Sequence, residues 1–82
     1  MSSVAMSYDK KYDILYARYP NAGDSYGEED DNGIVIFHNI QDDSVTGVAV
    51  YSISEKLKNG EIDLNELPVS LNRNRIAELG IA

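Results

Sequence analysis

The sequence predicts an α+β fold: an antiparallel meander of four or five strands, with a short helix and a C-terminal helix. Short apolar or alternating stretches, separated by turn residues, fill the chain up to about residue 53 and are typical of strands. Helix start and stop signals follow them in the second half. The length of 82 residues leaves room for one domain.

Two strands are predicted before the first long loop. Residues 3–8 alternate, with Val4, Met6 and Tyr8 on one face, which suits a half-buried strand. Residues 12–19 carry apolar side chains on both faces, which favours a central place in the sheet. Pro20 and the residues after it end that strand in a loop.

Three further strands are predicted between residues 25 and 53. Residues 25–30 form a weak acidic strand, and the Asn32-Gly33 pair after it is typical of a tight hairpin turn. The continuous apolar run 34–37 is predicted to be the buried core strand. Residues 45–53 resume a strand, in which Gly47 is predicted to mark a bulge.

Two helices complete the prediction. Ser52 followed by Glu55 is a capping-box pattern, so a short helix is expected over about residues 54–59, ending at Gly60. A last, amphipathic helix is expected to be capped by Ser70 and ended by Gly80. The chain is accordingly divided into a β-rich core domain with the short helix, residues 1–68, and a C-terminal helical extension, residues 69–82, packed on the core or on a partner.

The composition excludes several classes of partner. Acidic residues outnumber basic ones 14 to 7, and the net charge of −7 repels phosphate backbones, so no nucleic-acid partner is expected. No apolar run is long enough to span a bilayer and no signal peptide is recognisable, so we expect no membrane partner and a cytoplasmic location. The absence of cysteine excludes disulfides and thiolate metal sites.

The residues favour no catalytic chemistry. His38 is the only histidine, so no histidine cluster exists for zinc, and the sequence indicates no partner for a histidine-activated nucleophile. No cofactor, metal or catalytic residue is predicted. The acidic run from Asp24 to Asp31 is interpreted as protection of an edge strand rather than a calcium loop. Asp13 is expected to accept hydrogen bonds from the turn at Asp9. The alternative is a small metal-binding or catalytic protein that uses Asp9, Asp13 and His38.

Part of the chain resembles a known family. The likeness covers residues 6–54 and rests on Tyr8-Asp9-Lys10-Lys11-Tyr12-Asp13-Ile14-Leu15-Tyr16-Ala17-Arg18, Gly33-Ile34-Val35-Ile36 and Gly47-Val48-Ala49-Val50. These segments resemble the short prokaryotic domain-of-unknown-function family 2283. The resemblance implies a compact β-rich domain and supplies no catalytic residues. Acidic residues common in that family are replaced here by Phe37 and Ala49, so a cation site built from those two carboxylates could not form in this chain.

The function predicted is a non-catalytic protein–protein interaction or self-association module. A homodimer is expected, because a domain this small has more apolar surface than one sheet face can cover. Its predicted interface combines two sheet tyrosines with four apolar residues of the tail: Tyr16, Tyr19, Leu71, Ile76, Leu79 and Ile81. A partner protein is also possible, and an antitoxin-like regulator of such a partner is the third alternative, although no residue argues for it.

Overall fold

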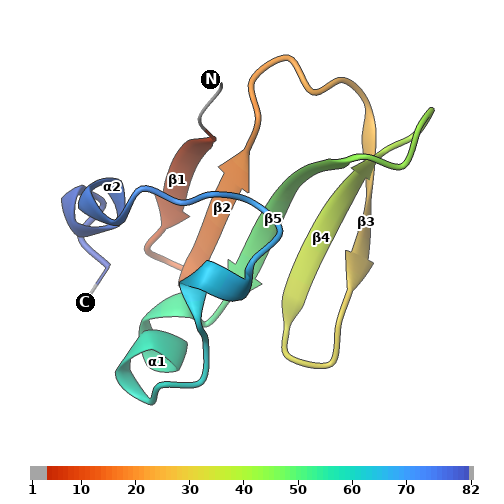
Figure 1. The fold of residues 1–82 in the computed structure, drawn as a ribbon. Coiled ribbons are helices and arrows are strands. Elements are labelled where there is room, and N and C mark those ends of the chain that lie inside the picture. The colour runs from red at the N-terminus through yellow and green to blue at the C-terminus, as the bar shows by residue number, and fades with distance from the viewer. Residues whose placement is uncertain (1–3, 82) are drawn as a thin grey trace.

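A computed structural model describes residues 4–81, in which five antiparallel strands form one sheet and two short helices follow (Figure 1). The elements are β1 (Ala5–Asp9), β2 (Ile14–Arg18), β3 (Ser25–Glu29), β4 (Ile34–Asn39), β5 (Val45–Tyr51), α1 (Ile53–Lys58), the 3-10 turn η1 (Leu64–Glu66) and α2 (Arg73–Glu78). The predicted α+β fold, with its antiparallel sheet, short helix and C-terminal helix, is confirmed.

The last strand of the sequence occupies the centre of the sheet. The strand order is β1-β2-β5-β4-β3, so the connection from β2 to β3 passes the end of β5 and leaves a place for it (Figure 1). Tight turns join the other neighbours along the chain. The expected central place of β2 is confirmed, since it pairs with β1 on one side and β5 on the other.

The prediction that residues 34–37 form the buried core strand is wrong. Every residue of β4 is only half-buried, whereas residues 46–50 of β5 are all buried. The difference follows from position, because β4 lies between β5 and the exposed edge strand β3. Within the sheet, the buried side chains of the core come from β1, β2 and β5. The β-branched residues therefore predict a strand here, but they do not predict how deeply it is buried.

The C-terminal segment supplies much of the core. One cluster joins Met6, Ala17 and Val48 of the sheet to Val69 and Ile76. A second cluster joins Leu15, Val50 and Ile53, and apolar residues from positions 64 to 81 pack against both. All these contacts are made on one face of the sheet.

Two glycines hold positions where a side chain would not fit. The register passes from Phe37–Gly47 to His38–Val45, so Thr46 is an extra residue and the predicted bulge is confirmed. A Cβ on Gly47 would lie 2.4 Å from the carbonyl oxygen of Ala17, closer than any real contact. Gly33 has a φ of 76°, which confirms the predicted hairpin glycine.

The predicted side-chain caps of both helices are wrong, although Ser52 does stand at the N-cap position of α1 and both helix ends are right. Ser52 precedes α1 in the left-handed conformation with a φ of 53°, and its side chain makes no cap hydrogen bond. The cap of α2 is Asn72, whose side chain accepts a hydrogen bond from the backbone N–H of Asn74, and not Ser70. Gly60 and Gly80 follow the two helices with positive φ, as predicted.

Candidate functional site

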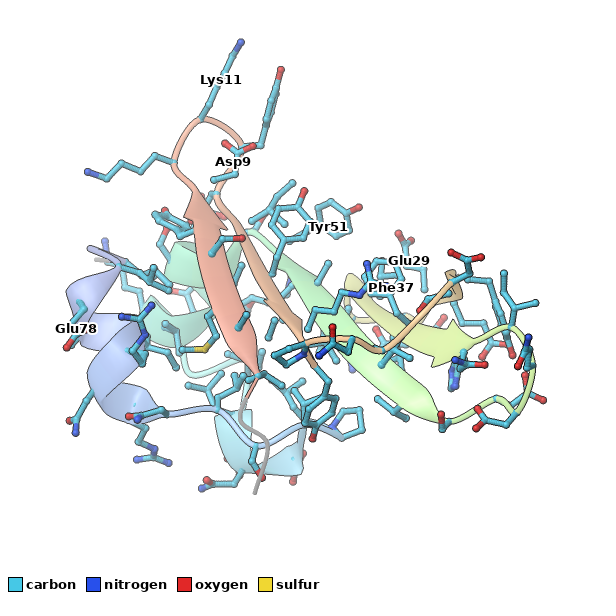
Figure 2. The ribbon with its side chains drawn as sticks, turned by 90° about the horizontal axis from the view of Figure 1, so that it is seen from above. Asp9, Lys11, Glu29, Phe37, Tyr51 and Glu78 are labelled. Atoms are coloured by element: carbon cyan, nitrogen blue, oxygen red, sulfur yellow. The ribbon has the colours of Figure 1, made fainter. Side chains whose placement is uncertain are left out.

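One face of the sheet is left open. Within residues 4–81, α1, η1 and α2 contribute to core clusters on the opposite face. Figure 2 shows Tyr51, Phe37 and Glu29 on the side of the sheet away from α2 and its Glu78. The open face therefore belongs to the strands alone.

Apolar side chains gather at the middle of this open face. The register places Tyr16 of β2, Ala49 of β5 and Val35 of β4 in one row across the sheet. Phe37 lies in the next row on β4, and Tyr51 lies at the end of β5. The Tyr16 and Tyr51 side chains are 39% and 40% exposed, and Val35 and Phe37 are half-buried. We call these five residues the open-face patch.

A hollow of about 590 Å³ lies beside the open-face patch, lined by Tyr16, Arg18, Asp24, Ser25, Phe37 and Ile40. Its position follows from a missing side chain, because Gly47 stands between Arg18 and Phe37 in their row. The Arg18 guanidinium donates a hydrogen bond to the carbonyl oxygen of Gly23 at the rim. The hollow can accept an apolar or aromatic group, and the Arg18 guanidinium lies at its edge.

Charge is distributed unequally on the two sides of β5. Arg18 lies on the β2 side, and Lys11 extends from the turn between β1 and β2 (Figure 2). The β3 side carries Glu29, and the acidic hairpin with Asp30 and Asp31 follows it. Exposed cations therefore predominate on the β2 side, where the half-buried Asp9 and, at the hollow, Asp24 also lie, and carboxylates predominate on the β3 side.

Asp13, one of the predicted alternative site residues, serves a structural purpose. Its carboxylate accepts hydrogen bonds from the Tyr8 hydroxyl at 2.7 Å, the Ser54 hydroxyl at 2.7 Å and the Ser54 backbone N–H at 3.2 Å. Partial burial raises the pKa of Asp13, but these hydrogen bonds outweigh that effect and hold the pKa below its ordinary value. The expectation that the Asp9 turn supplies its donors is wrong. Asp13 instead caps α1, to which it is not adjacent in sequence.

Asp9 and His38 also make structural contacts, each at a different place in the fold. The Asp9 carboxylate accepts hydrogen bonds from the backbone N–H groups of Lys11 at 3.0 Å and Tyr12 at 3.1 Å. The His38 ring stacks on Tyr26 with centroids 5.4 Å apart, and its Nδ1 lies 3.1 Å from the carbonyl oxygen of Asp43. Both arrangements stabilise turns or strand pairs.

The three residues of the alternative site do not meet. The register pairs Ile14, next to Asp13, with Tyr51 and pairs His38 with Val45. Val45 and Tyr51 are the two ends of β5, so Asp13 and His38 are separated by about 20 Å at the usual rise of a strand. In the part of the chain that the structure describes, no group of three or more acidic or histidine side chains is placed to hold a metal ion.

The predicted interface residues fall in two places. Tyr16 lies in the open-face patch, whereas Tyr19 packs against the core on the other face. Ile76 is only 8% exposed, and the remaining tail residues, Leu71, Leu79 and Ile81, pack against the core of the same chain.

Sequence reasoning missed the half-buried Val35 and Phe37 as residues of the open face, whereas Tyr51 is one of the six tyrosines for which the sequence favours an interface or a partly exposed core. The alternation of side chains along a strand could have indicated this shared face, because it places Val35 with Phe37 on β4 and Ala49 with Tyr51 on β5.

The chain resembles no characterised protein closely enough to assign a site by similarity. No family model, no curated protein and no solved structure matches it. The resemblance to family 2283 therefore stays a prediction. None of the helices described is long and apolar enough to cross a membrane. The site must be interpreted from its own residues.

Proposed function

We propose that the chain is a non-catalytic protein interaction module that binds a second copy of itself through the open face of its sheet. The observation that carries this proposal is the open-face patch, which lies at the centre of a sheet whose other face packs on the helices. A domain normally buries the apolar face of a sheet against a second layer. A contiguous apolar area without that layer marks an interaction site.

The type of residue in the patch supports binding of protein rather than catalysis. Tyrosine, phenylalanine and arginine are enriched at the centre of protein interfaces, where large side chains bury much area. Tyr16, Tyr51 and Phe37 lie together here with Arg18 beside them.

A second copy is a suitable partner because of size and charge. A chain of 82 residues buries a smaller share of its surface on folding than a larger domain does, and association supplies further burial. A two-fold interface uses the same patch on both copies. Because exposed cations predominate on one half of the open face and carboxylates on the other, the face is complementary to itself under a two-fold rotation that exchanges the halves.

Light scattering on the full chain at micromolar concentrations tests the proposal. The expected mass is twice that of the 9.1 kDa chain. Tyr51→Glu places a charge in the patch and is expected to give the single-chain mass with an unchanged circular dichroism spectrum. Tyr12→Glu is the matched control, because Tyr12 is 63% exposed and lies on the β1–β2 turn outside the patch. A full chain that scatters as a single copy would contradict the proposal.

A further inference from the structure

We infer that the two copies pack face to face about a two-fold axis that runs parallel to β5, so that Tyr16 of each copy meets Val35 of the other and Arg18 meets Phe37. This arrangement rests on the proposed function. It follows from the symmetry of the sheet and from the distribution of residues on either side of its central strand.

The open face is organised symmetrically about β5. Two strands lie on each side of β5, β2 and β1 on one and β4 and β3 on the other. Two rows of side chains cross the three central strands. One row reads Tyr16, Ala49, Val35, and the other reads Arg18, Gly47, Phe37. In both rows the smallest residue stands on β5.

A rotation by 180° about an axis above β5, parallel to the strands, exchanges the two sides of the face and keeps each row at its level. Each row then meets itself in reverse. Tyr16 faces Val35, and Ala49 faces its own copy across the axis. Because Ala49 and Gly47 project little, the strands can approach along the axis in these two rows, whereas Tyr51 at the end of β5 meets its own copy across the axis. Sheets packed this way keep their strands within about 30° of alignment.

The contacts made by this rotation are chemically favourable. The Tyr16 ring of one copy meets the apolar Val35 of the other beside the two Ala49 methyl groups. The Arg18 guanidinium is brought over the Phe37 ring, a cation–π contact. The side of the face that carries Arg18 and Lys11 meets the side that carries Glu29.

The other face-to-face arrangement is disfavoured by the same residues. An axis perpendicular to the strands would place β2 on β2 and β4 on β4. The side that carries Arg18 and Lys11 would then lie on the same side of the second copy, and with the axis in the Tyr16–Val35 row Glu29 would face Glu29. Like charges opposed at an interface disfavour that register.

Cysteine cross-linking tests the arrangement, because the chain contains no cysteine of its own. Chains with Tyr16→Cys and Val35→Cys are mixed at micromolar concentration and treated with a short bifunctional maleimide. The expected result is a cross-linked species in the mixture that neither variant forms alone. Lys58→Cys, on the exposed surface of α1, is the control and should cross-link to neither.

A second pair keeps the test independent of the contact side chains. Ser7 and Glu29 are exposed and extend the Tyr16–Val35 row to the edge strands, so Ser7→Cys mixed with Glu29→Cys should also cross-link. Self-cross-linking of Tyr16→Cys, or no product from either mixture although light scattering shows a dimer, would overturn the arrangement and leave the proposed function standing. A single-chain mass for the unmodified protein would overturn both.

Discussion

Replacing Asp13 with alanine is expected to lower the free energy of unfolding by about 2–3 kcal/mol. An N-cap contributes about 1 kcal/mol, and here the Asp13 carboxylate receives the Ser54 N–H and hydroxyl at the start of α1. A hydrogen bond to a charged group, such as that from the Tyr8 hydroxyl, contributes roughly 1.5 kcal/mol more. Asp13 also has a φ of 56°, which alanine adopts less readily than aspartate or asparagine.

Thermal unfolding followed by circular dichroism measures this loss. For a domain of this size, 1 kcal/mol corresponds to about 4–8 °C in Tm, so Asp13→Ala should lower Tm by roughly 10–20 °C. Asp13→Asn keeps an acceptor and the left-handed conformation and should lose less. Asp31→Ala removes an equal charge from the exposed hairpin and should leave Tm unchanged. A Tm for Asp13→Ala within about 2 °C of the unmodified chain would refute the reasoning.

The same group gives the stability a defined pH dependence. The pKa of Asp13 is lower in the folded chain than its unfolded value of about 3.9, so its contribution is complete above that value. This contribution is lost as the pH falls through the folded pKa. The hydrogen bond to Asp13 raises the pKa of Tyr8, so that contribution is lost as the pH rises above about 10. Asp13→Asn should therefore show a smaller fall in Tm between pH 7 and pH 3, and an equal fall would contradict the assignment.

Three further outcomes are expected. In a urea titration, Gly47→Ala should lower the free energy of unfolding by roughly 3 kcal/mol or more, the upper range for overpacking, because the added Cβ meets backbone atoms. Gly27→Ala should lower it by only about 1 kcal/mol, because the added Cβ meets the side chains of Val35 and Phe37. Ile76→Ala should lose about 2–4 kcal/mol in the same titration, and a chain that ends at Pro68 should fail to give a cooperative transition, since it lacks the buried Val69 and Ile76. Millimolar Ca²⁺, Mg²⁺, Mn²⁺ or Zn²⁺ should leave Tm unchanged, and a shift of several degrees would favour the metal-binding alternative.

The strands and turns could be predicted because their signals are local. Alternation within residues 3–8, the Asn32-Gly33 pair and the glycine at position 47 each report on their immediate neighbours. Gly47 is also required by the close approach of β2, a contact between residues distant in sequence. The sequence nevertheless contains its signal, because a glycine inside a strand pattern is itself unusual.

The order of strands could not be predicted in the same way. Residues 34–37 are the most apolar run of the chain, yet β5 is the buried strand. Burial is decided by neighbours, and β5 acquires β2 as a neighbour only because residues 19–24 pass across the sheet end and leave that position free. The open face followed from the same arrangement. Once β5 is central, Val35 and Phe37 flank it on the side that the tail does not reach.

The cap of α1 depends on a residue that no local rule could select. The capping-box pattern requires an extended residue whose side chain reaches the next backbone N–H groups, and Ser52 satisfies it in sequence. In the fold, Ser52 turns the chain from β5 into α1 in a left-handed conformation, which directs its side chain elsewhere. Asp13 supplies both missing acceptors, since its carbonyl oxygen receives the Ile53 N–H at 3.1 Å and its carboxylate receives the Ser54 N–H. The start of α1 is therefore determined by the β1–β2 turn. A substitution in that turn should disturb the structure of α1 more than that of the open face.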